Sequence, residues 1–155
     1  MELRAARESD LAVVLEWIEG EAACRMWAGP TIRYPATPET AWADMGASER
    51  NAYVLVGAAG NVVGFGQVLP KNDKTLHLAR LIVDPAARGQ GIGRALCMAL
   101  MVIGAANHGA ECLTLNVYES NSKAVRLYQG LGFAVEKRDV SGALAMVKPL
   151  ATASA

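Results

Sequence analysis

The stretch that most constrains the fold runs from residue 76 to residue 106, where two apolar segments flank a glycine-rich loop. It reads LHLARLIVDPAARGQGIGRALCMALMVIGAA. The first segment, rich in aliphatic and β-branched residues, predicts a strand over residues 75–83 that Asp84-Pro85 ends. The second predicts a helix from Gly91 to about Ala106. Three glycines within residues 88–93 join strand to helix in a tight turn.

A helix that begins directly after such a loop offers a binding site for an anion. Its first N–H groups have no partner inside the helix, and the helix dipole places partial positive charge there. Glycines allow the loop backbone to approach a phosphate closely, and Arg88 and Arg94 add formal charge. The alternative is a turn that joins strand to helix and holds no ligand.

Two common phosphate-binding motifs do not fit this loop. The P-loop requires G-x-x-x-x-G-K-[ST], and no lysine follows the glycines here. The dinucleotide fingerprint requires G-x-G-x-x-G or A; its third position falls on Arg94 when counted from Gly89, and on Leu96 when counted from Gly91. A nucleotide-binding oxidoreductase is therefore a weak alternative.

The rest of the chain predicts an α/β (α+β) fold, with helices packed on a mixed sheet. The expected strands are residues 2–6, a hairpin over 51–69 that turns at Ala59-Gly60-Asn61, residues 111–117, and a hairpin formed by 133–140 and 142–149. The expected helices are residues 10–21 with Ser9 as N-cap, a helix from Thr37-Pro38 to about Ala47, and residues 119–132 with Asn121 as N-cap and Gly132 as C-cap. Residues 24–37 look irregular. We expect one domain over residues 1–150 and a loose tail over residues 151–155.

Two segments of the chain resemble the GCN5-related N-acetyltransferase (GNAT) family. Arg88, Gly91 and Gly93 match the family's Q/R-x-x-G-x-G/A acetyl-CoA loop, and residues 115–133, LNVYESNSKAVRLYQGLGF, match its following strand and helix. The resemblance covers residues 76–133. It implies a mixed, mostly antiparallel sheet of about seven strands with a splayed central pair, flanked by about four helices.

The resemblance also implies where acetyl-CoA binds. Its pyrophosphate would lie on the backbone of the loop, and its pantetheine arm would pair with the preceding strand, which needs a free edge. The cofactor-binding residues implied are Leu81, Ile82, Val83, Arg88, Gly89, Gln90, Gly91, Ile92, Gly93 and Arg94, joined by Asn121. Asn121 has the helix N-cap as its alternative role. Asn116, an amide within an apolar strand, is a weaker candidate because a buried amide needs partners.

The family also implies catalytic roles for Tyr128 and His77. The tyrosine of the LY pair in the family often protonates the leaving thiolate of CoA, and Tyr128 shares a helix face with Asn121. Its alternative is a tyrosine of the core. His77 stands where several members have a glutamate, and histidine titrates near neutrality, so it could take the proton of the amine. An exposed histidine at a strand end, with ordered water as base, is the alternative. Because successive side chains of a strand point to opposite faces, we expect one face of this strand to hold His77, Ala79, Leu81 and Val83.

The acceptor side is the least determined part of the sequence. Trp27, Arg33 and Tyr34 could line a substrate pocket, and Glu16, Glu19 and Glu21 could attract an amine. Core packing of the aromatic rings and a solvated acidic face are the alternatives.

Charge and cysteine content narrow the class of protein further. The chain has 15 basic and 15 acidic residues, which argues against general binding to nucleic acid or anionic membranes. It has no apolar run long enough for a membrane span and no apolar leader segment, and its three cysteines and two histidines do not have metal-site spacing. We expect a cytoplasmic N-acetyltransferase that moves an acetyl group from acetyl-CoA to a primary amine by direct attack, without a metal. A non-catalytic acyl-CoA-binding regulatory module is the alternative, and a homodimer stays open.

Overall fold

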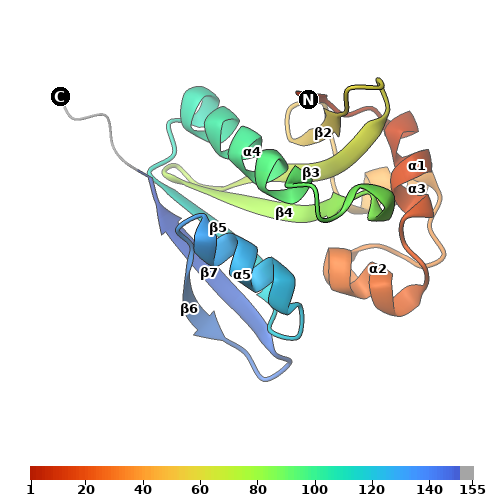
Figure 1. Cartoon of the computed structure of the whole chain (residues 1–155). Coiled ribbons are helices and arrows are strands. Elements are labelled where there is room, and N and C mark those ends of the chain that lie inside the picture. The colour runs from red at the N-terminus through yellow and green to blue at the C-terminus, as the bar shows by residue number, and fades with distance from the viewer. Residues whose placement is uncertain (151–155) are drawn as a thin grey trace. The chain divides into compact units, whose positions relative to one another are not determined.

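The computed structural model describes residues 1–150, apart from the side chains of Asn107 and His108. These residues form seven strands, five α-helices and three short 3₁₀ helices (Figure 1). The strands are β1 (Glu2–Ala5), β2 (Ala52–Val56), β3 (Val62–Asn72), β4 (Thr75–Val83), β5 (Cys112–Tyr118), β6 (Ala134–Arg138) and β7 (Ala143–Pro149). The helices are α1 (Leu11–Glu16), α2 (Glu21–Ala28), α3 (Pro38–Asp44), α4 (Ile92–His108) and α5 (Ser122–Gly130), with 3₁₀ helices η1 (Glu8–Asp10), η2 (Gly29–Thr31) and η3 (Pro85–Ala87).

The chain forms two compact units, each built from two separate segments. Unit 1 comprises Met1–Gln67 and Arg80–Leu96, and unit 2 comprises Val68–Ala79 and the chain from Cys97 onward. The elements β3, β4 and α4 pass from one unit into the other. The predicted loose tail, residues 151–155, lies outside the described residues, and the single domain expected over residues 1–150 stays a prediction.

Unit 1 is an antiparallel arrangement of strands with small helices packed together. β1 pairs with β2 from Glu2 opposite Val56 to Ala5 opposite Tyr53, and β2 pairs with β3. Helix α3 lies against α1 (Figure 1). The core of this unit consists of apolar side chains from all these elements, including Leu11, Val14, Cys24, Ala41, Val54 and Phe65.

Unit 2 is centred on β5, which has one parallel and one antiparallel neighbour. The parallel ladder with β4 runs from Thr75 opposite Cys112 to Leu78 opposite Leu115. On its other side β5 pairs antiparallel with β7, and β7 pairs with β6. Helix α5 packs on β5 (Figure 1). The buried residues of these strands include Leu76, Leu78, Leu113, Leu115, Leu144 and Met146.

The bonded strands follow the order β1-β2-β3-β4-β5-β7-β6. This confirms the predicted mixed, mostly antiparallel sheet of seven strands. The parallel ladder accounts for four residues of β4, which continues to Val83. The separation predicted for the central strand pair stays a prediction.

The helices of the N-terminal half differ from those predicted. Residues 24–37 are not wholly irregular, because α2 begins at Glu21 and continues to Ala28. The helix predicted over residues 10–21 ends at Glu16. Ser9 is not its N-cap but lies inside η1, where the Asp10 carboxylate accepts a hydrogen bond from the backbone N–H of Arg7 at 2.8 Å. The described residues thus contain one α-helix more than expected.

Helix α4 is 17 residues long. No helix among residues 1–150 combines the length and apolar character that crossing a bilayer requires.

Candidate functional site

The loop between β4 and α4 is anchored at its start and open at its glycines. The backbone N–H of Asp84 donates to the carbonyl of Val63 at 2.9 Å, and the Asp84 carboxylate accepts from the N–H of Ala86 at 2.9 Å. Gly89 and Gly91 have φ angles of +80° and +77°, and a Cβ atom added to either would meet nothing within 4 Å. The backbone conformation therefore calls for glycine, while the space beside the loop is free for a ligand.

The residues around the helix start give this loop the properties of an anion site. Residues 88–91 are exposed, and buried Ile92 anchors the first turn of α4. The first backbone N–H of α4 that donates to a carbonyl of the preceding turn is that of Ala95, which donates to the Gly91 carbonyl at 3.0 Å. The N–H groups before Ala95 therefore depend on partners outside the helix. The exposed side chains of Arg88 and Arg94 add positive charge. A pyrophosphate fits this donor set.

The strand that leads to the loop contains a backbone irregularity at Arg80. Its φ angle is +53°, in the left-handed region that arginine seldom occupies. The indole Nε1 of Trp27 donates a hydrogen bond of 2.8 Å to the Arg80 carbonyl. Leu76 and Leu78 are buried and alternate with half-buried neighbours, whereas residues 79–83 are all half-buried. The predicted alternation from His77 to Val83 therefore does not hold past Arg80, because the left-handed residue interrupts the pleat.

The Arg80 side chain belongs to a polar network that the sequence analysis missed. Its Nη1 donates to Oε1 of Gln67 at 2.6 Å, and Gln67 is fully buried. The Gln67 amide in turn donates to the Met45 carbonyl at 3.1 Å and to Oδ1 of Asn51 at 3.3 Å. Burial lowers the pKa of the Arg80 guanidinium below its usual value. The signal in the sequence was a pair of polar residues, in FGQVL and LARLIV, inside otherwise apolar strands.

Asn121 is the N-cap of α5, in unit 2, as the sequence predicted. Its Oδ1 accepts a hydrogen bond from the Ala124 N–H at 3.4 Å. A role in binding the cofactor stays a prediction. Asn116 is exposed on β5, opposite Ala145 of β7, so the interpretation as a buried amide was wrong. The alternation of β5 turns its side chain away from the buried Leu115 and Val117.

Tyr128 lies on α5 with 8% of its surface exposed. Its ring meets Phe133 edge to face, with ring centroids 6.2 Å apart. Burial, and secondarily the neighbouring Cys97 thiol, raise the pKa of the Tyr128 phenol well above its usual value. The phenol is therefore protonated at neutral pH, which is the state that a general acid needs. The same contacts also suit a core tyrosine, and the catalytic role stays a prediction.

His77 lies on β4 within unit 2, directly opposite Thr114 in the parallel ladder. Its Nδ1 is 2.7 Å from the Thr114 hydroxyl oxygen, and the residue is half-buried. The threonine orients the imidazole ring, and which atom donates depends on the histidine tautomer. The role of His77 as a base stays a prediction.

The three candidate substrate residues have different surroundings in unit 1. Trp27 is half-buried, with its ring edge to face against Phe65 at a centroid distance of 6.2 Å. Arg33 donates three hydrogen bonds to the Asp44 carboxylate, two from its side chain, of 3.0 and 3.1 Å, and one from its backbone N–H, of 3.0 Å. Tyr34 is 44% exposed. The acidic candidates Glu16, Glu19 and Glu21 are all exposed, as expected of a solvated face.

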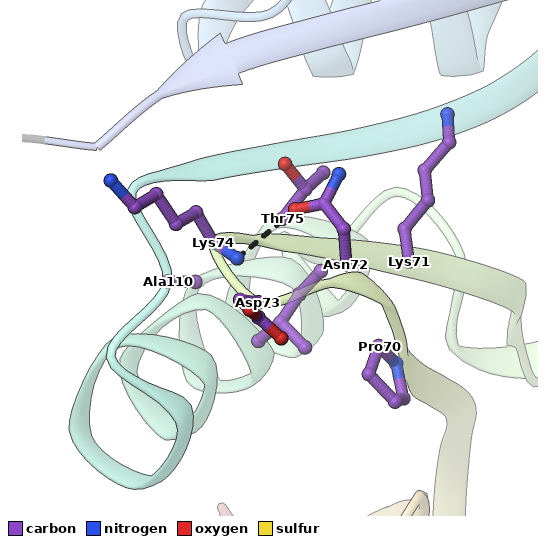
Figure 2. A pocket seen from close by; sticks show the side chains of 8 residues that line it. Pro70, Lys71, Asn72, Asp73, Lys74, Thr75 and Ala110 are labelled. Atoms are coloured by element: carbon purple, nitrogen blue, oxygen red, sulfur yellow. Dashed lines mark hydrogen bonds between the residues drawn. The ribbon is translucent and has the colours of Figure 1, made fainter.

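A hollow of about 380 Å³ lies in unit 2, where β3 turns into β4. Figure 2 shows its lining, in which the backbone N–H of Lys74 donates to Oδ1 of Asn72 at 3.0 Å. The lining residues are Pro70, Lys71, Asn72, Asp73, Lys74, Thr75, Leu76 and Ala110. None of the predicted site residues is among them.

The candidate residues are thus distributed over the two units. Unit 1 holds the glycine loop and the end of β4, from Leu81 to Val83, whereas unit 2 holds Asn121, Tyr128 and His77. Within the described residues, no group of three histidine, cysteine or acidic side chains is arranged to hold a metal ion.

A model of the acetyltransferase (GNAT) family matches residues 14–133 of this chain. The chain is 32% identical over 114 residues to the spermine/spermidine N(1)-acetyltransferase of Bacillus subtilis, a match that covers 67% of this chain and 75% of that protein. It is 38% identical over 74 residues to the peptidyl-lysine N-acetyltransferase YjaB of Salmonella typhimurium. That second match covers 48% of this chain and 47% of the relative, so the aligned part is about half of either protein.

Among solved structures, the chain is similar to a GCN5-related N-acetyltransferase from Kribbella flavida. The TM-score is 0.73 and the sequence identity 28%, with 96% of this chain and 97% of that chain covered. The similarity in fold therefore extends well beyond the segments that the relatives share in sequence.

Proposed function

The chain belongs to the acetyltransferase (GNAT) family, and we propose that it transfers an acetyl group from acetyl-CoA to a primary amine. The observation that carries this proposal is the loop at Gly89 and Gly91, which has left-handed glycines, open space beside them and an exposed helix start behind them. This donor set suits the pyrophosphate of CoA. The backbone of Leu81 to Val83 is the proposed partner of the pantetheine arm.

The proposed chemistry assigns each group of this chain one task. The thioester supplies the acetyl group, and the amine attacks it directly while a thiolate leaves. Backbone N–H groups of Leu81–Val83 polarise the thioester carbonyl. Tyr128, whose phenol is protonated at neutral pH, is the proposed donor of the proton that the thiolate receives. His77, oriented by Thr114, or an ordered water removes the proton of the amine.

The relatives set the range of acceptors to test. Their names specify spermine and spermidine in one case and peptidyl-lysine in the other, so both polyamines and protein amines belong in the panel. The panel also contains amino acids and peptides with a free N-terminus. Release of free CoA from acetyl-CoA is measured for each amine. Turnover of at least one amine is expected, whereas CoA binding without turnover would favour a regulatory module.

We place the protein in the cytoplasm and leave a homodimer as a prediction. Cys24, Cys97 and Cys112 are free thiols, a state that suits a reducing compartment. Sedimentation of the purified chain measures its oligomeric state directly.

A further inference from the structure

Arg80 is a cation inside unit 1 for which the described residues supply no anion. Its guanidinium is half-buried, and the partner it has, Gln67, is a neutral amide. None of the ion pairs among the described residues includes Arg80. Among the side chains that the structure describes, its Nε is the one buried nitrogen or oxygen that lacks a hydrogen-bond partner. A charge in this state costs free energy that an anionic partner would recover.

The surrounding residues hold this cation in one position. The Arg80 carbonyl is bound by Trp27, whose ring packs on Phe65. The Gln67 amide nitrogen is committed to Met45 and Asn51, which turns its oxygen toward Arg80. An arginine held at positive φ carries backbone strain, and strain of this kind persists where the surrounding structure fixes it. The guanidinium is therefore preorganised before any ligand arrives.

The donors that remain on Arg80 match a carboxylate. A guanidinium has five N–H donors in a planar fork, and only Nη1 is engaged by Gln67. Nε is buried, whereas Nη2 is not among the buried unpaired atoms, so a carboxylate would meet the guanidinium fork at Nη2. A lysine at this position would supply a point charge without that fork.

The position of Arg80 indicates which molecule carries the anion. Arg80 directly precedes Leu81–Val83, the proposed site of the pantetheine arm and thioester, and those parts of acetyl-CoA are uncharged. The pyrophosphate of CoA is assigned to the loop over residues 88–94. The anion that meets Arg80 would therefore belong to the acceptor.

We propose that Arg80 selects acceptor amines that also carry a carboxylate, and that it disfavours polyamines. This inference rests on the proposed function and specifies its substrate class. A polyamine brings further positive charge beside a guanidinium that already lacks a counterion, whereas an amino acid supplies that counterion.

The test compares amino acids with their carboxamides as acceptors, in the wild type and in Arg80→Met. Because the same two acceptors are used with both proteins, their difference in amine pKa cancels from the comparison. The ratio of kcat/KM for acid over carboxamide is expected to fall about tenfold or more in Arg80→Met, while spermidine is used as well as before or better. Arg4→Met is the matched control, since Arg4 already has Asp10 as its carboxylate partner, and it keeps the wild-type ratio.

Gln67→Glu is the second variant, which retains Arg80. It places a carboxylate where the Gln67 oxygen now accepts from Nη1, so the guanidinium gains an internal counterion. The ratio of acid over carboxamide is expected to fall here too, and thermal unfolding of both variants shows whether they are folded. A wild-type ratio in the folded variants overturns the inference and leaves the proposed function intact.

Two other outcomes separate the inference from the proposed function. A weaker Kd for CoA in Arg80→Met, with an unchanged ratio, would assign Arg80 to a phosphate of CoA and overturn the inference. A wild type that acetylates no amine would overturn the proposed function instead. Calorimetry with butyrate and butyramide then tests Arg80 without turnover. If the wild type binds butyrate but not butyramide, and Arg80→Met binds neither, the carboxylate site is supported. Equal binding of butyrate and butyramide by the wild type contradicts it.

Discussion

At the scale of single residues, burial sets the protonation of Tyr128 and Cys97. Both lie in unit 2, Cys97 with 2% of its surface exposed and Tyr128 with 8%. Desolvation disfavours the charged form of a thiol and of a phenol alike, so both pKa values rise, that of Cys97 to about 12. Both groups are neutral over the physiological range, and only Tyr128 is placed in the proposed chemistry.

Replacing Tyr128 by phenylalanine tests its role as general acid. The ring stays against Phe133 while the proton donor is lost, so kcat is expected to fall about 10²-fold or more at an unchanged Kd for CoA. Steady-state kinetics and calorimetry provide the two numbers. Full turnover by the variant would return Tyr128 to a packing role.

The alkaline stability of the protein reports on Cys97. Its pKa is raised to about 12 in the folded state, from an ordinary value of 9.0, so only the unfolded chain loses this proton between these values. The stabilisation is present below pH 9 and is lost as pH rises toward 12. The free energy of unfolding is expected to fall by about 1.4 kcal/mol per pH unit from this thiol alone.

Urea unfolding of the wild type and of Cys97→Ala between pH 8.5 and 10 measures that slope. The slope is expected to be shallower in Cys97→Ala, by a difference that approaches this amount toward pH 10, although the variant is less stable throughout because it leaves a small cavity. Identical slopes in the two proteins would mean that the thiol is accessible to solvent in the folded state.

The residues of the candidate site were predictable from sequence to different degrees. The loop glycines follow from their spacing, because left-handed backbone calls for glycine and few residues replace it. Arg80 could not be placed, because strand alternation assumes a regular pleat and Arg80 breaks it. Asn116 was misjudged for a related reason: an apolar neighbourhood in sequence does not tell which face of a strand is covered.

At the scale of elements, the start of α2 shows why helix signals failed in the N-terminal half. The N-cap of α2 is Gly20, which has no side chain that could cap the helix. The residues that α2 buries are the small Cys24 and Ala28. A helix without a polar cap, whose fully buried residues are small, leaves little pattern to detect. Helix α3, by contrast, has Thr37 accepting from the Thr40 N–H at 3.2 Å and Pro38 at its first position, and was predicted correctly.

The end of α5 permits a paired test of backbone conformation. Gly132 follows the helix with φ of +99°, whereas Gly130 is helical and open to added atoms. Gly132→Ala is expected to cost about 1 kcal/mol of unfolding free energy, because alanine is strained at that φ. A Cβ there would lie 2.6 Å from Nζ of Lys148, the flexible end of a side chain that can move away.

Gly130→Ala is the matched control, and its effect has the opposite sign. Alanine favours helical backbone, so this variant is expected to gain about 0.5 kcal/mol. The midpoints of urea unfolding of the two variants, compared with that of the wild type, measure the sign of each change. Two changes of the same sign would show that the left-handed conformation is not what sets the cost at position 132.

At the scale of the whole molecule, the fold class was predictable because it rests on the alternation of apolar segments with turns. Every strand of the structure overlaps a segment predicted as strand, although β3 continues to Asn72 beyond the predicted end at residue 69, and the glycine loop lies between β4 and α4 as expected. The substrate class was not predictable, since it depends on contacts such as Arg80 with Gln67 that join positions distant in sequence.

Binding of CoA is expected to stabilise the whole chain against heat. At a concentration about 100-fold above Kd, a ligand of the folded state alone adds about 2.7 kcal/mol, which corresponds to about 5–10 °C in Tm for a chain of 155 residues. Thermal unfolding with CoA, and with NAD as control, measures the shift. Stabilisation by NAD but not by CoA would sink the proposed function.

The division of the chain into two units affects how the protein folds during synthesis. Unit 1 needs Arg80–Leu96, which is made only after the segment Val68–Ala79 of unit 2 has been translated. Its first 67 residues therefore emerge from the ribosome before Ile82 can pack against their core and before Gln67 has its arginine donor. A nascent chain that stalls before residue 80 would expose that unfinished surface to chaperones and proteases.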